Sequence, residues 1–191
     1  ISISTLYLYP DNPKLGGQKF VYIVAFSGIG MVLGAFIVGK YLREKPKFPL
    51  IFWGFSIIGL NLIFLSLTNN IPLELKYRVP FDLSFFEEEL YITLRILYTY
   101  LVAFVIGIGC AYVAIPVQTI LQSSIPETMR GKVFGVQFTL LSTASTLPVV
   151  IIALIADSVG VSSIMLLAGL PILTFGVYGL FKLRKKLKRS I

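Results

Sequence analysis

Five long runs of this sequence contain no charged residue, and short segments that hold most of the charges separate them. Each run is about as long as the roughly 20 apolar residues that a helix needs to cross a bilayer. In lipid every backbone amide must pair within the chain, so such runs predict helices. The five predicted spans are 20–38, 48–67, 96–117, 133–156 and 161–181.

The composition strengthens this interpretation. Of the 191 residues, 56% are hydrophobic and 14% are charged, and the mean hydropathy is +0.86. A soluble domain has about 25% charged residues and 45–50% apolar ones. Buried core helices of a soluble protein are the alternative, and this composition argues against them. The sequence therefore predicts an all-α integral membrane protein in contact with the lipid bilayer.

The charges predict an orientation. One side of the predicted bundle holds 12 basic and 2 acidic residues, and the other side holds 5 basic and 7 acidic ones. The basic side is expected to be cytoplasmic, which places the C-terminus on the cytoplasmic side of the cell (inner or plasma) membrane. Residues 182–191 form a basic tail directly after a span, where anionic headgroups attract such residues. We therefore expect no nucleic acid as a partner.

A first span that enters from the outside predicts an earlier helix. The apolar, aromatic stretch 1–10 ends at Pro10 and suits the outer end of such a helix, so residues 1–19 are assigned to that helix and an outer loop. Residues 20–181 then hold the five complete spans. The chain also begins with Ile1 and not with Met, so we expect it to be a piece of a longer protein.

Two segments carry motifs. Gly30 and Gly34 have the spacing that leaves one face of a helix bare, for static packing or for a sliding contact. Gly39 and Arg43 lie in a short charged turn between the first two spans. In the segment after the third span, Ser124 is a candidate N-cap.

The same segment predicts a well-capped helix start. Pro126 is expected in the first turn, and Glu127 is favoured there by the helix dipole. Arg130 lies one turn further and can pair with Glu127. Gly131 and Gly135 repeat the four-residue spacing of the first span.

Residues 126–135 read Pro-Glu-Thr-x-Arg-Gly-x-Val-x-Gly, which resembles the loop between the tenth and eleventh helices of major facilitator superfamily transporters. The similarity is greatest to the bacterial drug and macrolide efflux branch. Asp157, three residues before a glycine, resembles that branch too, and residues 34–45 resemble the glycine-rich signature between the eighth and ninth helices. The resemblance implies the C-terminal six-helix half of that fold, as five complete spans plus the end of a sixth.

The resemblance also implies a function: secondary active transport of a small molecule by alternating access, as export of drug-like or amphipathic compounds. It implies the N-terminal half of the same chain as a partner. Polar residues of the third and fourth spans are the candidates for lining the substrate cavity, with interhelical hydrogen bonds or an aromatic belt as the alternative. The candidates are Tyr98, Thr99, Tyr112, Gln118, Gln137, Thr139 and Ser142. The motif residues assigned to gating are Gly30, Gly34, Gly39, Arg43, Pro126, Glu127, Arg130, Gly131, Gly135 and Asp157.

The sequence offers little for other chemistry. It has no histidine, one cysteine and no charge inside the five runs, so we expect no enzyme, no bound metal and no cofactor. Coupling to a proton gradient is left open, and its carboxylate is expected outside these spans, with neither Glu127 nor Asp157 as the proton carrier. The alternatives are a lipid-moving (lysophospholipid-type) member of the superfamily and a non-transporting membrane assembly protein.

Overall fold

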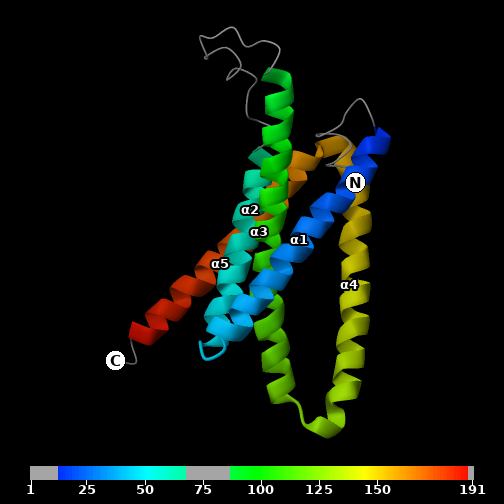
Figure 1. The fold of residues 1–191 in the computed structure, drawn as a ribbon. Coiled ribbons are helices and arrows are strands. Elements are labelled where there is room, and N and C mark those ends of the chain that lie inside the picture. The colour runs from blue at the N-terminus through cyan, green and yellow to red at the C-terminus, as the bar shows by residue number, and fades with distance from the viewer. Residues whose placement is uncertain (1–12, 68–86, 189–191) are drawn as a thin grey trace.

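In the computed structural model, residues 13–67 and 87–188 are described, and they are almost entirely helical (Figure 1). The predictions for residues 1–10 therefore lie outside the described part of the chain. The helices are α1 (Pro13–Tyr41), α2 (Lys47–Leu67), α3 (Glu87–Ser124), the short 3-10 helix η4 (Glu127–Met129), α4 (Arg130–Val159) and α5 (Val161–Lys188).

Each of the five uncharged runs lies inside one helix. Every one of these helices continues beyond its run at one end or at both ends. Four helices are long and apolar enough to cross a membrane, over Val21–Tyr41, Lys47–Ser66, Ile96–Ser124 and Ser162–Lys185. The chain is therefore an all-α membrane protein. The remaining predicted span lies in α4, a continuous helix of 30 residues, and its passage through the bilayer stays a prediction.

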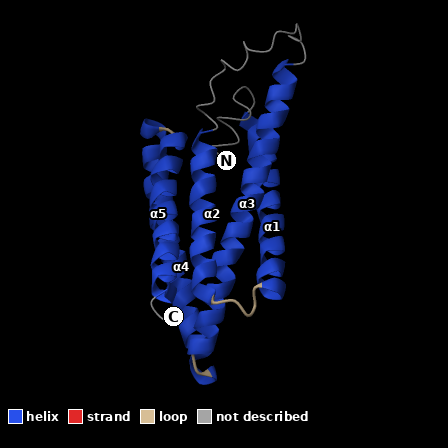
Figure 2. Ribbon diagram, turned by 90° about the vertical axis from the view of Figure 1, so that its left-hand side faces the viewer, coloured by secondary structure: helices blue, strands red, loops and turns tan. Residues whose placement is uncertain are grey.

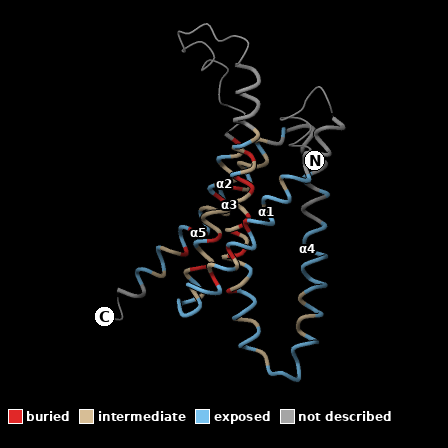
Figure 3. The backbone as a smooth tube through the Cα atoms, in the orientation of Figure 1, coloured by how far each residue is buried: buried red, intermediate tan, exposed pale blue. Residues whose placement is uncertain are grey.

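Four of the helices pack as a row in the order α1, α3, α2, α5. Extensive contacts join α1 to α3, α3 to α2 and α2 to α5, and the buried residues concentrate along these contacts (Figure 3). The buried apolar side chains include Val38, Leu50, Val102, Ala103, Ala111 and Pro116. Helix α4 contacts α5 and η4 only sparsely and stands away from the row in Figure 1.

Glycines let the helices of the row approach closely. A Cβ on Gly30 of α1 would collide with the backbone oxygen of Phe104 in α3, and one on Gly107 of α3 would collide with that of Ser27. A Cβ on Gly34 would lie 2.8 Å from the Cβ of Ala111. The static-packing interpretation of Gly30 and Gly34 is therefore the arrangement in this structure.

The contacts of α2 with α3 and α5 also depend on glycines. A Cβ on Gly54 would lie 2.9 Å from the oxygen of Gly109 in α3. On the other side of α2, a Cβ on Gly169 of α5 would lie 3.1 Å from the oxygen of Gly59. Small residues at such contacts let helices gain van der Waals contact where lipid gives no hydrophobic driving force between them.

One hydrogen bond also joins two helices of the row. The hydroxyl of Ser66, which is fully buried at the end of α2, donates to the carbonyl of Ser162 in α5 at 2.7 Å. At the same end, α4 passes into α5 through Gly160, whose φ of +82° suits a residue without a Cβ. This is the glycine that follows Asp157 in the sequence motif.

The α1–α2 turn, the α3–α4 turn and the C-terminal end of α5 lie at one end of the bundle (Figure 2). The basic residues of these segments whose side chains are described are Lys40, Arg43, Lys45, Lys47, Arg130, Lys132, Lys182, Arg184 and Lys185. We call this the basic end. The fold thus brings together the charges on which the predicted orientation depends.

Candidate functional site

Helix α4 differs from the other helices because its described side chains are half-buried or exposed all around. By the 3.6-residue helical period, two sets of residues lie on different sides of it. One set is mainly aliphatic and faces α3 and α2. The other set is small and polar and faces away from them.

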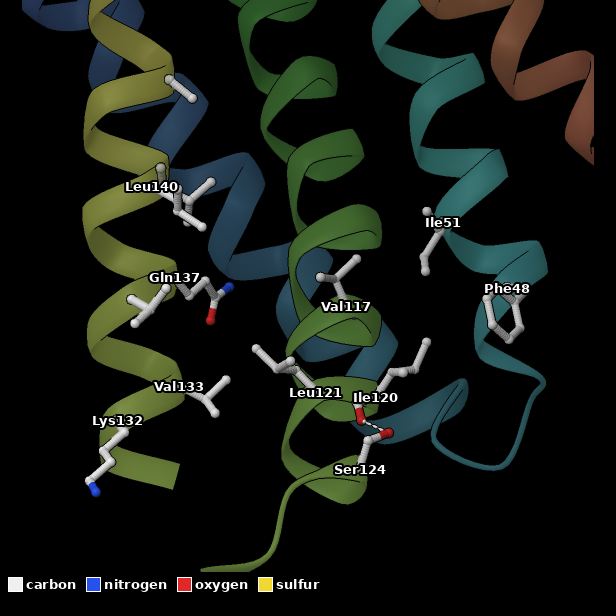
Figure 4. A pocket seen from close by; sticks show the side chains of 13 residues that line it. Phe48, Ile51, Val117, Ile120, Leu121, Ser124, Lys132, Val133, Gln137 and Leu140 are labelled. Carbon is white, nitrogen blue, oxygen red and sulfur yellow. Dashed lines mark hydrogen bonds between the residues drawn. The ribbon is translucent and has the colours of Figure 1, made fainter. Parts of the chain in front are cut away.

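The first side forms one wall of a groove of about 830 Å³ between α4, the C-terminal part of α3 and the start of α2 (Figure 4). The lining is aliphatic or aromatic apart from three side chains. Its residues are Phe48, Ile51, Val117, Ile120, Leu121, Ser124, Lys132, Val133, Val136, Gln137, Leu140, Leu141 and Ala144.

The polar residues of the groove lie toward the basic end. Lys132 lies in the first turn of α4, Ser124 is the last residue of α3, and Gln137 lies higher on α4, with its amide on the side of α3 (Figure 4). The Gln137 amide has no hydrogen-bond partner within the described chain. Deeper in the groove, Leu140 and Ala144 continue the wall as aliphatic surface.

The N-cap prediction for Ser124 is wrong. Its hydroxyl donates to the carbonyl of Ile120 at 2.8 Å, within α3, and not to a backbone amide of the next helix. Pro126 is the N-cap of η4 without a side-chain cap bond, so it lies one position before the predicted first turn. The backbone of Met129 donates to the carbonyl of Pro126 at 3.0 Å and closes this turn.

The predicted pair in this turn is confirmed. Arg130 lies 3.5 Å from the carboxylate of Glu127, and both side chains are exposed. Such a pair contributes little in water, but it leaves no uncompensated acid at the basic end of α4. Lys132, two residues further, has no acidic partner in the described part of the chain.

The second side of α4 is a stripe that we call the small-residue face: Gly131, Gly135, Thr139, Ser142 and Thr146. A Cβ on Gly131 or Gly135 would meet no other atom within 4 Å. Thr139 donates to the carbonyl of Gly135 at 3.0 Å, and Thr146 donates to that of Ser142 at 2.9 Å. The hydroxyls of Thr139 and Thr146 thus bond to their own helix, and all five residues of this face are exposed in the described part of the chain.

The structure does not bring the seven cavity candidates into one cavity. Gln137 lines the groove, whereas Thr139 and Ser142 lie on the small-residue face. The α3 candidates are scattered along their helix: Thr99 is buried, Tyr98 and Tyr112 are half-buried, and Gln118 is exposed next to the groove.

The motif residues assigned to gating also lie in different parts of the structure. Gly39 is exposed, with nothing within 4 Å of a Cβ built on it. The carbonyl of Arg43 accepts a hydrogen bond from the ammonium of Lys47, which closes the α1–α2 turn. The side chain of Asp157 lies outside the described residues.

The sequence analysis did not select Lys132 and Val136 as site residues, although an aliphatic pattern at helical spacing from Val133 marks the α4 wall of the groove.

Comparisons with family models, with curated proteins and with solved structures find no match to this chain.

Proposed function

We propose that this chain is the C-terminal half of a secondary active transporter that exports drug-like or amphipathic small molecules by alternating access. The observation that carries the proposal is the small-residue face of α4, which lies uncovered in a helix predicted to span the membrane. The resemblance of residues 126–135 to major facilitator transporters supports the same function.

Contact with lipid acyl chains is unfavourable for the small-residue face. Gly131 and Gly135 leave backbone bare, and Thr139, Ser142 and Thr146 add a row of hydroxyls. Polar groups inside a membrane usually face other protein or a water-filled cavity. We infer that this face borders a passage between this half and the N-terminal half, with the basic end on the cytoplasmic side.

Four packed helices supply the framework for this passage. Glycine contacts fix α1, α2, α3 and α5 as one unit, and a rocking mechanism needs each half to move as a body. An assembly protein is the second candidate function, because the same face of α4 would serve as a permanent contact for a partner helix. The two candidates differ in whether water reaches the face.

Cysteine labelling in membranes tests this difference. In the parent protein with Cys110→Ala, we expect Ser142→Cys to react with a membrane-impermeant maleimide, because thiol reaction needs water. The matched control is Leu167→Cys, an α5 position that is 77% exposed and is expected to face acyl chains. It should react at least tenfold more slowly.

Alternating access makes a second expectation for the same variants. Ser142→Cys should be reachable from the cytoplasmic side in one fraction of molecules and from the outside in another, and a transported dye such as ethidium should shift the ratio. Equal, slow labelling of the two variants would contradict a water-filled passage. Labelling from one side alone, unchanged by every dye, would favour the assembly protein.

A further inference from the structure

We propose that the groove between α2, α3 and α4 holds one acyl chain of an anionic membrane phospholipid, with its phosphate against Lys132. This groove lies on a different side of α4 from the small-residue face, so the inference goes beyond the proposed transport path. A lipid would be bound here, not transported.

The place and size of the groove suit an acyl chain. Its α2 and α3 walls belong to the segments that are long and apolar enough to cross a membrane. Its volume of about 830 Å³ falls in the range of roughly 300–1,000 Å³ that small-molecule sites occupy. Val117, Leu121 and Leu140 contribute branched aliphatic surface from facing helices (Figure 4).

The order of polar groups along the groove matches the order of groups in a phospholipid. Lys132 and Ser124 lie at the basic end. Gln137 follows five residues later, about 7.5 Å further along the axis at a rise of 1.5 Å per residue. Its free amide can donate to the carbonyl of an ester linkage. Beyond Gln137, the α4 wall is formed by Leu140, Leu141 and Ala144, where the chain would lie.

The charge at this end selects an anionic headgroup. The acid nearest in sequence, Glu127, is paired with Arg130, so Lys132 contributes an uncompensated positive charge. The α1–α2 turn adds Arg43 and Lys45 against the single acid Glu44, and α2 begins with Lys47, at the same end of the bundle. Basic sites between transmembrane helices near the cytoplasmic leaflet bind anionic headgroups, and a zwitterionic lipid would gain less here.

Tryptophan quenching by brominated lipids tests the proposal. Trp53 is the only tryptophan of the described chain, so Trp53→Phe with Phe48→Trp places one fluorophore at the groove. In vesicles, brominated phosphatidylglycerol should associate with this site about fivefold more tightly than brominated phosphatidylcholine, as expected for one lysine near the membrane surface.

Three variants test whether Lys132 causes the preference for the anionic lipid. Lys132→Gln should bring the ratio of the two lipids close to one, and Lys132→Arg should restore it. Lys185→Gln, which removes an exposed charge of α5 outside the groove, should leave it unchanged. Trp53→Phe with Leu167→Trp reports on ordinary lipid contact and should show no preference.

Two outcomes would overturn the proposal. Equal quenching by both lipids at Phe48→Trp would exclude selection by charge. Absence of quenching there, with normal quenching at Leu167→Trp, would mean that protein and not lipid fills the groove. Because Ser142→Cys reports on a different side of α4, the lipid site and the transport function can each fail alone.

Discussion

The packed row of helices and α4 use the same small-residue spacing in opposite surroundings. In α1, Gly30 and Gly34 touch the backbone of α3 so closely that a Cβ would collide. In α4, Gly131 and Gly135 have the same spacing and meet nothing within 4 Å. A four-residue glycine repeat therefore indicates that a helix is ready for close approach, but it does not say whether the partner lies in the same packed unit.

One hydroxyl of the row, that of Ser66, shows the same contrast with α4, whereas other row hydroxyls such as those of Ser56 and Thr119 bond within their own helices. Ser66 bonds across the row to α5 and is completely buried. In α4, Thr139, Ser145 and Thr146 bond to carbonyls three or four residues earlier in their own helix. In the row, glycines and the hydroxyl of Ser66 join helices, whereas the glycines and hydroxyls of the small-residue face of α4 are exposed.

The largest expected effect comes from filling a glycine contact of the row. Gly30→Ala should lower the free energy of unfolding by about 2–3 kcal/mol, because the new Cβ must push the backbone of α3 away. Unfolding by titration with dodecyl sulfate in micelles measures this change.

The control is two residues away in the same helix. Gly28→Ala meets nothing within 4 Å, so it should be neutral or stabilise by up to about 1 kcal/mol through helix propensity. Gly135→Ala in α4 should behave like Gly28→Ala. Equal losses for Gly30→Ala and Gly28→Ala would contradict the close α1–α3 contact.

The helices could be predicted from the sequence because their cause is local. A long uncharged run must pair its own backbone in lipid, and each run does lie within one helix. The neighbours of each helix could not be predicted, since they depend on which glycine face meets which backbone. Gly30 and Gly135 look alike in the sequence, and their difference appears only in three dimensions.

The candidate site was predicted less well for the same reason. Polarity selected residues such as Thr99 and Tyr112, but they lie earlier along α3 than the residues 117–124 from which α3 contributes to the groove. Gln137 was found because an amide in an apolar run is conspicuous. Lys132 was not, because one more lysine at a basic end gives no local signal that it lines a groove.

A smaller effect is expected from the hydrogen bond that joins α2 to α5. Ser66→Ala should cost about 1 kcal/mol of unfolding free energy, within the range for interhelical hydrogen bonds in membranes. Ser145→Ala in α4 is the matched control, since its hydroxyl bonds within its own helix and is exposed. It should change stability by less than about 0.5 kcal/mol. A loss at Ser145→Ala as large as at Ser66→Ala would remove the contrast between the two regions.

The smallest expected effect concerns the pair at the start of α4. Glu127 and Arg130 are exposed and 3.5 Å apart, and exposed pairs three or four residues apart contribute about 0.2–0.5 kcal/mol. A double-mutant cycle of Glu127→Gln and Arg130→Gln should give a coupling of this size, and added salt should screen it. A coupling above about 1 kcal/mol that persists in high salt would mean that the pair is desolvated by protein outside the described residues. In that event, α4 would be packed at its basic end as firmly as the helices of the row, and its contrast with them would be confined to the small-residue face.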